Sequence, residues 1–257
     1  MIALTHTVSP QIHQCELSHL SRMDIDYERA VRQHTVYCQK LRELGCEVIE
    51  LTQNEHLPDS TFIEDTAVVL NEIAVMANMG VISRQPEVAS VAQILAQYRQ
   101  LAHIQPPATL EGGDVLRMGQ TLYVGLSART NRAGVESLQN ILAPWGYRIV
   151  VVSLRDCLHL KSACSALDEK TLLVNPAWLD LAPLGSFDHV CVPTSEPGAA
   201  NVLSIAGILL MHAGFPETAT RLRELGFRVE TLDISELMKA EAAVTCSSIL
   251  FEVSPAS

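Results

Sequence analysis

The chain alternates between helical and extended apolar patterns along its whole length. Apolar side chains recur with helical spacing over residues 27–44, 86–101, 131–142 and 217–225. Short apolar runs of strand length separate these segments, and polar or glycine-containing turns break the runs at residues 71–72, 119–120, 168–170 and 206–207. The pattern predicts β-hairpins that alternate with helices.

A repeated motif ends three of the helical segments. The segment Leu41–Leu51 (LRELGCEVIEL) recurs at Leu222–Leu232 (LRELGFRVETL), and residues 142–151 have the same shape. Each copy is typical of a helix end, a glycine C-cap and a following strand.

Polar or reactive residues stand where the predicted hairpins begin. These markers are Asp65, Asp114, His159, Asn201 and Cys246, separated by steps of 49, 45, 42 and 45 residues. A regular step in this range indicates a repeat architecture. We therefore expect one α/β domain over residues 1–257, a ring of five modules in which each module has a sheet and a covering helix and the markers meet at the axis. An ordinary open α/β sheet is the alternative, and it would spread the markers along the sheet.

Composition narrows the classes of ligand. Eighteen Lys and Arg residues against 29 Asp and Glu residues give a net charge of −11, which disfavours nucleic acid and anionic membranes as partners and favours a small cationic ligand. The sequence shows neither a signal-peptide pattern nor a run of apolar residues long enough to span a membrane, so we expect a cytoplasmic protein. The seven cysteines are scattered without CxxC spacing, which predicts reduced thiols.

Cys246 and His159 are candidates for nucleophilic catalysis, because a thiol near a base or a cation becomes a strong nucleophile. A buried filler cysteine and a structural histidine are the alternatives. The spacing of Cys157, His159 and Cys164 could suggest zinc, but it lacks the further ligands of a four-coordinate site.

Acidic residues gather at the marker ends of the modules, in segments apolar enough to be buried: Asp59, Glu64, Asp65, Glu111 and Asp114. Buried carboxylates need partners, which can be backbone amides, arginines or a cationic substrate. Three arginines follow strand-like segments, where a guanidinium could bind a carboxylate through two hydrogen bonds or could simply be solvated: Arg84, Arg129 and Arg132.

Six segments carry a resemblance to a known family: residues 57–69, 110–115, 124–131, 158–165, 199–202 and 244–247. In order and spacing they resemble the dimethylarginine dimethylaminohydrolases, which belong to the guanidino-group modifying enzymes. The resemblance covers essentially the whole chain and implies a five-bladed α/β propeller, the pentein fold. This agrees with the five modules inferred from the pattern.

The resemblance also implies roles for site residues. It makes Cys246 the nucleophile, His159 the general acid and base, and Glu111 the carboxylate that supports the histidine. Asp65 would hold the guanidinium nitrogens. The remaining substrate-binding positions would be Glu64 and Asp59 in the polar wall, Arg84 and Arg129 at the α-carboxylate, and Leu17 and Ala240 in loop contacts. Ala240 departs from the larger aliphatic residue usual in the family, and Arg132 lies outside the motif.

The implied reaction is the hydrolysis of an N-ω-methylated arginine to citrulline and a methylamine through a cysteine thiouronium intermediate. It needs no metal and no organic cofactor. One alternative is a hydrolase or deiminase of another guanidino amino acid, although arginine deiminases have longer chains. A second alternative is a non-catalytic propeller that binds a partner, but such a protein would lack the Cys and His markers. The sequence is compatible with a homodimer.

Overall fold

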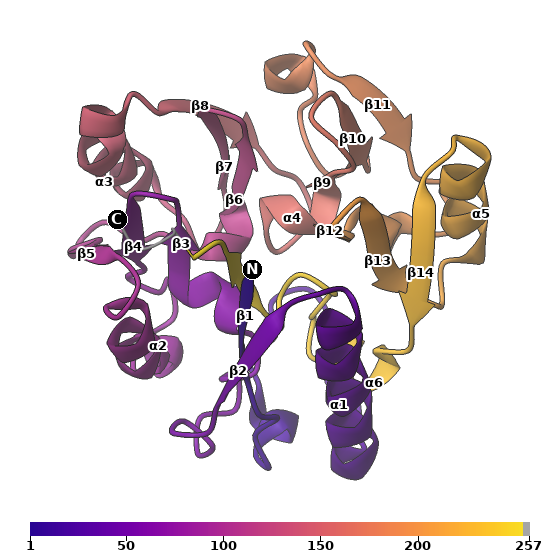
Figure 1. Cartoon of the computed structure of the whole chain (residues 1–257), viewed down its shortest axis with the longest axis horizontal. Helices are drawn as coiled ribbons and strands as arrows, with labels where there is room; N and C mark the ends of the chain where they lie inside the picture. The colour runs from indigo at the N-terminus through magenta and orange to yellow at the C-terminus, as the bar shows by residue number, and fades with distance from the viewer. Residues whose placement is uncertain (254–257) are drawn as a thin grey trace.

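Each of the predicted modules forms its own three-stranded sheet, and the five sheets surround a common axis (Figure 1). The computed structural model describes residues 1–253. Within every sheet the first two strands are antiparallel and the third is parallel to the second. The sheets are β3 (Ala67–Val69), β4 (Ile73–Met76), β5 (Gln100–His103); β6 (Val115–Met118), β7 (Thr121–Leu126), β8 (Arg148–Ser153); β9 (Cys164–Ala166), β10 (Thr171–Val174), β11 (Asp188–Cys191); β12 (Leu203–Ile205), β13 (Ile208–His212), β14 (Arg228–Leu232); and β15 (Ile249–Phe251), β1 (Ile2–His6), β2 (Glu47–Leu51). The ring of five modules, each with its own sheet, is confirmed, and the open sheet is excluded.

Strands from opposite ends of the described chain close the ring. Ile2 of β1 pairs with Phe251 of β15 in antiparallel register, and β1 also pairs in parallel with β2. The sheet that follows the Cys246 turn is therefore shared between residues distant in sequence.

Four longer helices lie on the outside of the ring (Figure 1): α1 (Tyr27–Glu43), α2 (Glu87–Leu95), α3 (Arg132–Leu142) and α5 (Pro216–Glu224). The side chain of Asp26 caps α1 by accepting a hydrogen bond from the backbone nitrogen of Arg29 at 3.0 Å, and Asn131 caps α3 in the same way. Gly45, Gly146 and Gly226 have φ of +89°, +72° and +92°, so the predicted left-handed caps are confirmed.

Two expectations about helices were wrong. The helix predicted over residues 86–101 was too long, because α2 ends at Leu95 and Leu101 belongs to β5. The module of β9, β10 and β11 has only a 3₁₀ turn, Ala182–Leu184, where a covering helix was expected. Pro176 and Pro183 fall in this connection, and proline removes the backbone N–H that a helix interior needs.

Apolar side chains fill the space between each sheet and its neighbours. One cluster joins Val115 and Val124 of adjacent strands to Leu138 of α3, all of them buried. Two helices are short: α4 (Leu160–Ala163) directly follows His159, and α6 (Ser235–Met238) packs against α1. Among the residues that the structure describes, no helix has both the length and the apolar character to cross a bilayer.

Candidate active site

The segments that carry the markers meet at the ring axis and are joined there by hydrogen bonds. Gly113 donates its backbone N–H to Asp65 at 3.1 Å, and Leu160 donates to Asp114 at 3.0 Å. On the other side of the ring, the Asn201 side chain donates to the carbonyl oxygen of Lys161 at 2.9 Å and accepts from Thr245, while Glu64 donates its backbone N–H to the carbonyl oxygen of Cys246. The expectation that the markers converge is confirmed.

Two glycines permit this close approach. A Cβ atom on Gly112 would lie 2.1 Å from the carbonyl oxygen of Glu64. A Cβ atom on Gly113 would lie 2.6 Å from Asp65 Oδ1 and 2.7 Å from His159 Nδ1. The Glu-Gly-Gly-Asp segment therefore keeps side-chain bulk away from the point where the turns meet.

His159 is held between carboxylates at the centre of the site. Its Nε2 lies 2.8 Å from Glu111 Oε2, and its Nδ1 lies 3.7 Å from Asp65 Oδ1. Burial alone would lower the pKa of His159, but the negative charges of Asp65, Asp114 and Glu111 outweigh burial and raise the pKa to about 9. The imidazole is therefore protonated at neutral pH.

Glu111 has no exposed surface and is fixed at both carboxylate oxygens. Its Oε1 accepts the backbone N–H of Gly80 at 2.9 Å, while Oε2 faces His159. Burial favours the neutral acid, yet the hydrogen bond and charge of His159 lower the pKa of Glu111. The resulting ion pair supports the protonated histidine.

Arg84 bridges two buried carboxylates. Its Nη1 donates to Asp65 Oδ2 at 2.8 Å, and its Nη2 donates to Glu87 Oε2 at 2.9 Å and to the carbonyl oxygen of Phe62 at 3.1 Å. Its nitrogens thus bind groups of the protein. Contact between Arg84 and a substrate α-carboxylate stays a prediction, whereas its contact with Asp65 is a feature that the sequence did not indicate.

Arg129 differs from Arg84 because one nitrogen of its guanidinium has no hydrogen-bond partner among residues 1–253. The side chain is only 4% exposed, and Nη2 donates to Ser18 Oγ at 3.2 Å. Within residues 1–253, buried Nη1 has no hydrogen-bond partner; Glu111 Oε1 lies 3.7 Å away. A buried cationic donor without a partner is costly, so this atom is suited to an incoming anion.

Cys246 lies in the turn that leads into β15 and is half-buried. The backbone N–H of Ala243 points at its sulfur at 3.3 Å. Burial, followed by the negative charges of Glu64 and Asp65, raises the pKa of the Cys246 thiol well above its ordinary value. The free site therefore holds a neutral thiol.

Glu64 is the carboxylate beside this turn, and both of its oxygens are engaged. Lys161 donates to Oε1 at 2.7 Å, and Thr245 donates its hydroxyl to Oε2 at 2.7 Å. The sequence did not single out Lys161 or Thr245, although Thr245 adjoins the nucleophile candidate.

The predicted loop positions lie at the edge of the site. Both oxygens of Asp59 accept the backbone N–H of Glu16, at 3.2 and 3.1 Å, so Asp59 orients the loop that contains Leu17. Leu17 packs against the apolar cluster that includes buried Ala240. The two positions therefore belong to one apolar cluster, and their contact with a substrate stays a prediction.

Glu241 holds the same loop from the other side. Its carboxylate accepts the backbone N–H groups of Ser18, His19 and Leu20, at 2.9, 2.5 and 2.6 Å. Its own backbone has a φ of +61°, which is uncommon outside glycine. Only its position next to Ala240 could have suggested this residue from the sequence.

A cavity of about 450 Å³ adjoins the segment before Cys246. Its lining includes Ala243, Val244, Asn201 and the loop residues His19 and Leu20, but none of the ten predicted site residues. The loop held by Glu241 therefore borders an open volume next to the nucleophile candidate.

The zinc site suggested by the spacing of Cys157, His159 and Cys164 does not form. The sulfur of Cys157 lies near the carbonyl oxygens of His159 and Trp178, and Cys164 is buried in β9. Over residues 1–253, neither cysteine belongs to a group of side chains close enough to share an ion.

The fold and this cluster define the class of the protein. It is a five-module α/β propeller of the pentein type, with a cysteine, a histidine and buried carboxylates brought together at its axis. Proteins of this class modify guanidino groups.

Comparison with known proteins narrows the class. Residues 7–175 match the family model for N,N dimethylarginine dimethylhydrolase, eukaryotic. The N(G),N(G)-dimethylarginine dimethylaminohydrolase of Streptomyces coelicolor is 36% identical over 96% of this chain and 95% of its own. The chain therefore belongs to the dimethylarginine dimethylaminohydrolase family.

Solved structures agree with this assignment. The Pseudomonas aeruginosa dimethylarginine dimethylaminohydrolase, as a cysteine-to-serine variant with citrulline, superposes with a TM-score of 0.92 at 28% identity, over 97% of this chain and 98% of the other. The N-terminal domain of ArgZ, an arginine dihydrolase from cyanobacteria, superposes with a TM-score of 0.83 at 19% identity and 96% coverage of both chains, which shows the shared fold alone.

Proposed function

We propose that the protein hydrolyses N-ω-methylated arginine to citrulline and a methylamine through a covalent intermediate on cysteine. The observation that carries the proposal is the buried cluster at the axis, where Glu111 and Asp65 hold a protonated His159 and the charge of Asp65 also acts on the Cys246 thiol. Relatives that bear the dimethylarginine dimethylaminohydrolase name support the substrate class.

Substrate binding uses the charges already present. A guanidinium carbon is a poor electrophile because its charge spreads over three nitrogens, so carboxylates must hold the group planar and localise that charge. We assign this task to Asp65, with Glu64 and Asp59 in the polar wall. The free Nη1 of Arg129 would receive the α-carboxylate.

The first half-reaction forms the covalent intermediate. The bound guanidinium lowers the pKa of the Cys246 thiol, whose proton passes to solvent, and the resulting thiolate attacks the guanidinium carbon. Protonated His159 gives its proton to the methylamine nitrogen as the C–N bond breaks. A thiouronium on Cys246 and a neutral imidazole remain.

The second half-reaction releases the product. Neutral His159 takes a proton from water, and the oxygen attacks the thiouronium carbon. The C–S bond then breaks, the proton of the new hydroxyl group passes to the sulfur, and citrulline leaves with the thiol restored. Glu111 stabilises the imidazolium that forms again.

A substrate panel tests the proposal. Purified protein is incubated with dimethylarginine, monomethylarginine, arginine and agmatine, and the ureido product of each substrate and the released amine are quantified together. We expect citrulline and a methylamine in equal amounts from a methylated substrate, and no product with Cys246→Ser. A preference for arginine with release of ammonia would instead favour the alternative guanidino hydrolase, and no turnover of any substrate would refute an enzymatic role.

A further inference from the structure

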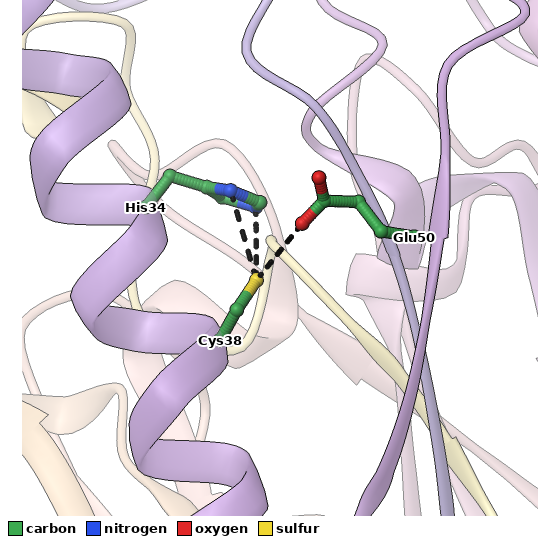
Figure 2. A group of neighbouring side chains, drawn as sticks. All are labelled: His34, Cys38 and Glu50. Carbon is green, nitrogen blue, oxygen red and sulfur yellow. Dashed lines mark hydrogen bonds between the residues drawn. The ribbon is translucent and has the colours of Figure 1, made fainter.

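A second cluster of ligand-type side chains lies outside the site, between the outer helix α1 and strand β2. It consists of His34, Cys38 and Glu50 (Figure 2). His34 and Cys38 are four residues apart on α1, so they lie on one face of the helix. Glu50 approaches from β2, and Figure 2 shows its carboxylate and the imidazole pointing at the sulfur.

The separations fit ligands of one small cation. Cys38 Sγ lies 3.7 Å from His34 Nδ1, 3.9 Å from Nε2 and 3.6 Å from Glu50 Oε2. Zinc bonds of about 2.3 Å to sulfur and about 2.0–2.1 Å to nitrogen or oxygen, at tetrahedral angles, place the ligand atoms about 3.5 Å apart. Small side-chain adjustments would bring all three atoms into coordination.

The surroundings of His34 also suit a ligand. The side chain is buried, so water does not compete for its ring nitrogens. Within the described residues, the only hydrogen-bond partner of its ring nitrogens is the weakly interacting sulfur of Cys38. Glu50 is exposed, which gives an ion and a water ligand access to the cluster.

We propose that His34, Cys38 and Glu50 form a zinc-type metal site, with water as the fourth ligand. On binding, the thiol proton of Cys38 passes to solvent, and the thiolate coordinates the divalent ion. Sulfur and imidazole ligands favour Zn²⁺ over Mg²⁺ or Ca²⁺, which prefer oxygen ligands. The site is separate from the residues assigned to the hydrolytic reaction.

Such a site would fasten α1 to β2 in the sheet that follows the nucleophile turn. Tyr37, between the two helical ligands, shares a hydrogen bond of 2.7 Å with Ser248, two residues after Cys246. A bound ion would therefore reinforce a helix that contacts the catalytic segment, and its assigned effect is structural.

Cobalt is the spectroscopic probe that tests the proposal. The full chain carrying Cys246→Ser, which removes the catalytic thiol, is freed of metal and titrated with Co²⁺. We expect one equivalent to bind with a near-ultraviolet thiolate-to-cobalt band, and Zn²⁺ to displace it. Cys38→Ser should abolish the band, and exposed Glu50→Ala should weaken Co²⁺ binding by roughly tenfold or more, whereas the matched controls Cys46→Ser and Glu47→Ala should change neither.

Three outcomes would overturn the proposal. These are the absence of a thiolate band, a band that persists in folded Cys38→Ser, and Co²⁺ binding that is unchanged in Glu50→Ala. Because Asp65, Glu111 and His159 also lie within 4.8 Å of one another, His159→Ala is added to the Cys246→Ser background to exclude binding there. Circular dichroism confirms folding of every variant, and the failure of this site leaves the proposed hydrolysis untouched.

Discussion

The ionisation of Cys246 provides the sharpest test of the proposed mechanism. Burial and the charges of Glu64 and Asp65 raise the thiol pKa in the free enzyme, so substrate must supply the positive charge that generates the thiolate. The test compares two alkylating reagents of the same size and with the same leaving group, neutral chloroacetamide and cationic chloroacetamidine.

The expected magnitude follows from the geometry of a charge beside the sulfur. At about 4 Å and an effective dielectric constant of about 20, a unit positive charge stabilises a thiolate by up to about 4 kcal/mol. This corresponds to as much as roughly 10³ in the thiolate fraction, and a contact in a partly hydrated pocket would give about 10- to 10³-fold.

The assay measures second-order inactivation rate constants from pH 6 to 10, with mass spectrometry to locate the label on Cys246. The chloroacetamide rate should rise with pH to a midpoint above about 8.5, the ordinary value for cysteine. At pH 7 the ratio of amidine to amide rates should exceed the ratio for a small free thiol by about 10- to 10³-fold. A midpoint below about 6, or an unchanged ratio, would show that the free enzyme already holds a thiolate, and the reasoning would be refuted.

Three substitutions test the other assignments. Cys246→Ser should lower turnover by at least about 10³-fold while the circular dichroism spectrum is retained, and activity in a preparation free of wild-type protein would place the nucleophile elsewhere. Glu111→Gln removes a charge that raises the pKa of His159, so this pKa should fall from about 9 towards 6.5 in an NMR titration. The value of kcat should fall by about 10²-fold or more. An unmoved pKa would contradict the ion pair between Glu111 and His159. Arg129→Lys should raise KM by about tenfold or more with little change in kcat, because lysine lacks the planar pair of donors of a guanidinium. Arg132 is exposed, so Arg132→Lys is the control and should change neither KM nor kcat. If the two substitutions had equal effects on KM, Arg129 would not belong to the binding site.

Periodic features of the sequence were sufficient to predict the ring. Glycine caps and turn residues act locally, so Gly45, Gly146 and Gly226 revealed module boundaries without knowledge of the packing. The prediction failed where a strand follows a helix without a glycine, as at Leu95 and Leu101, because apolar periodicity alone does not separate the two elements.

The sequence indicated individual site residues but not which of them contact one another. The markers and the family resemblance located His159 and Asp65, yet the binding of Asp65 by Arg84 depends on how two modules meet at the axis. Glu241 was missed for the same reason: its partners lie more than 220 residues away along the chain. In the outer cluster, neither His34 nor Cys38 was singled out from the sequence, and only the fold brings Glu50 to them.

The pairing of β1 with β15 has a consequence for biosynthesis. A nascent chain can complete the four sheets formed by β3 to β14 while β1 and β2 still lack their third strand. Cys246 and β15 are translated after the segments that contain Asp65, Glu111 and His159, so the nucleophile candidate is the last of these residues to reach the axis. The Cys246 turn is anchored in the ring only when Ile249–Phe251 pairs with Ile2–Leu4.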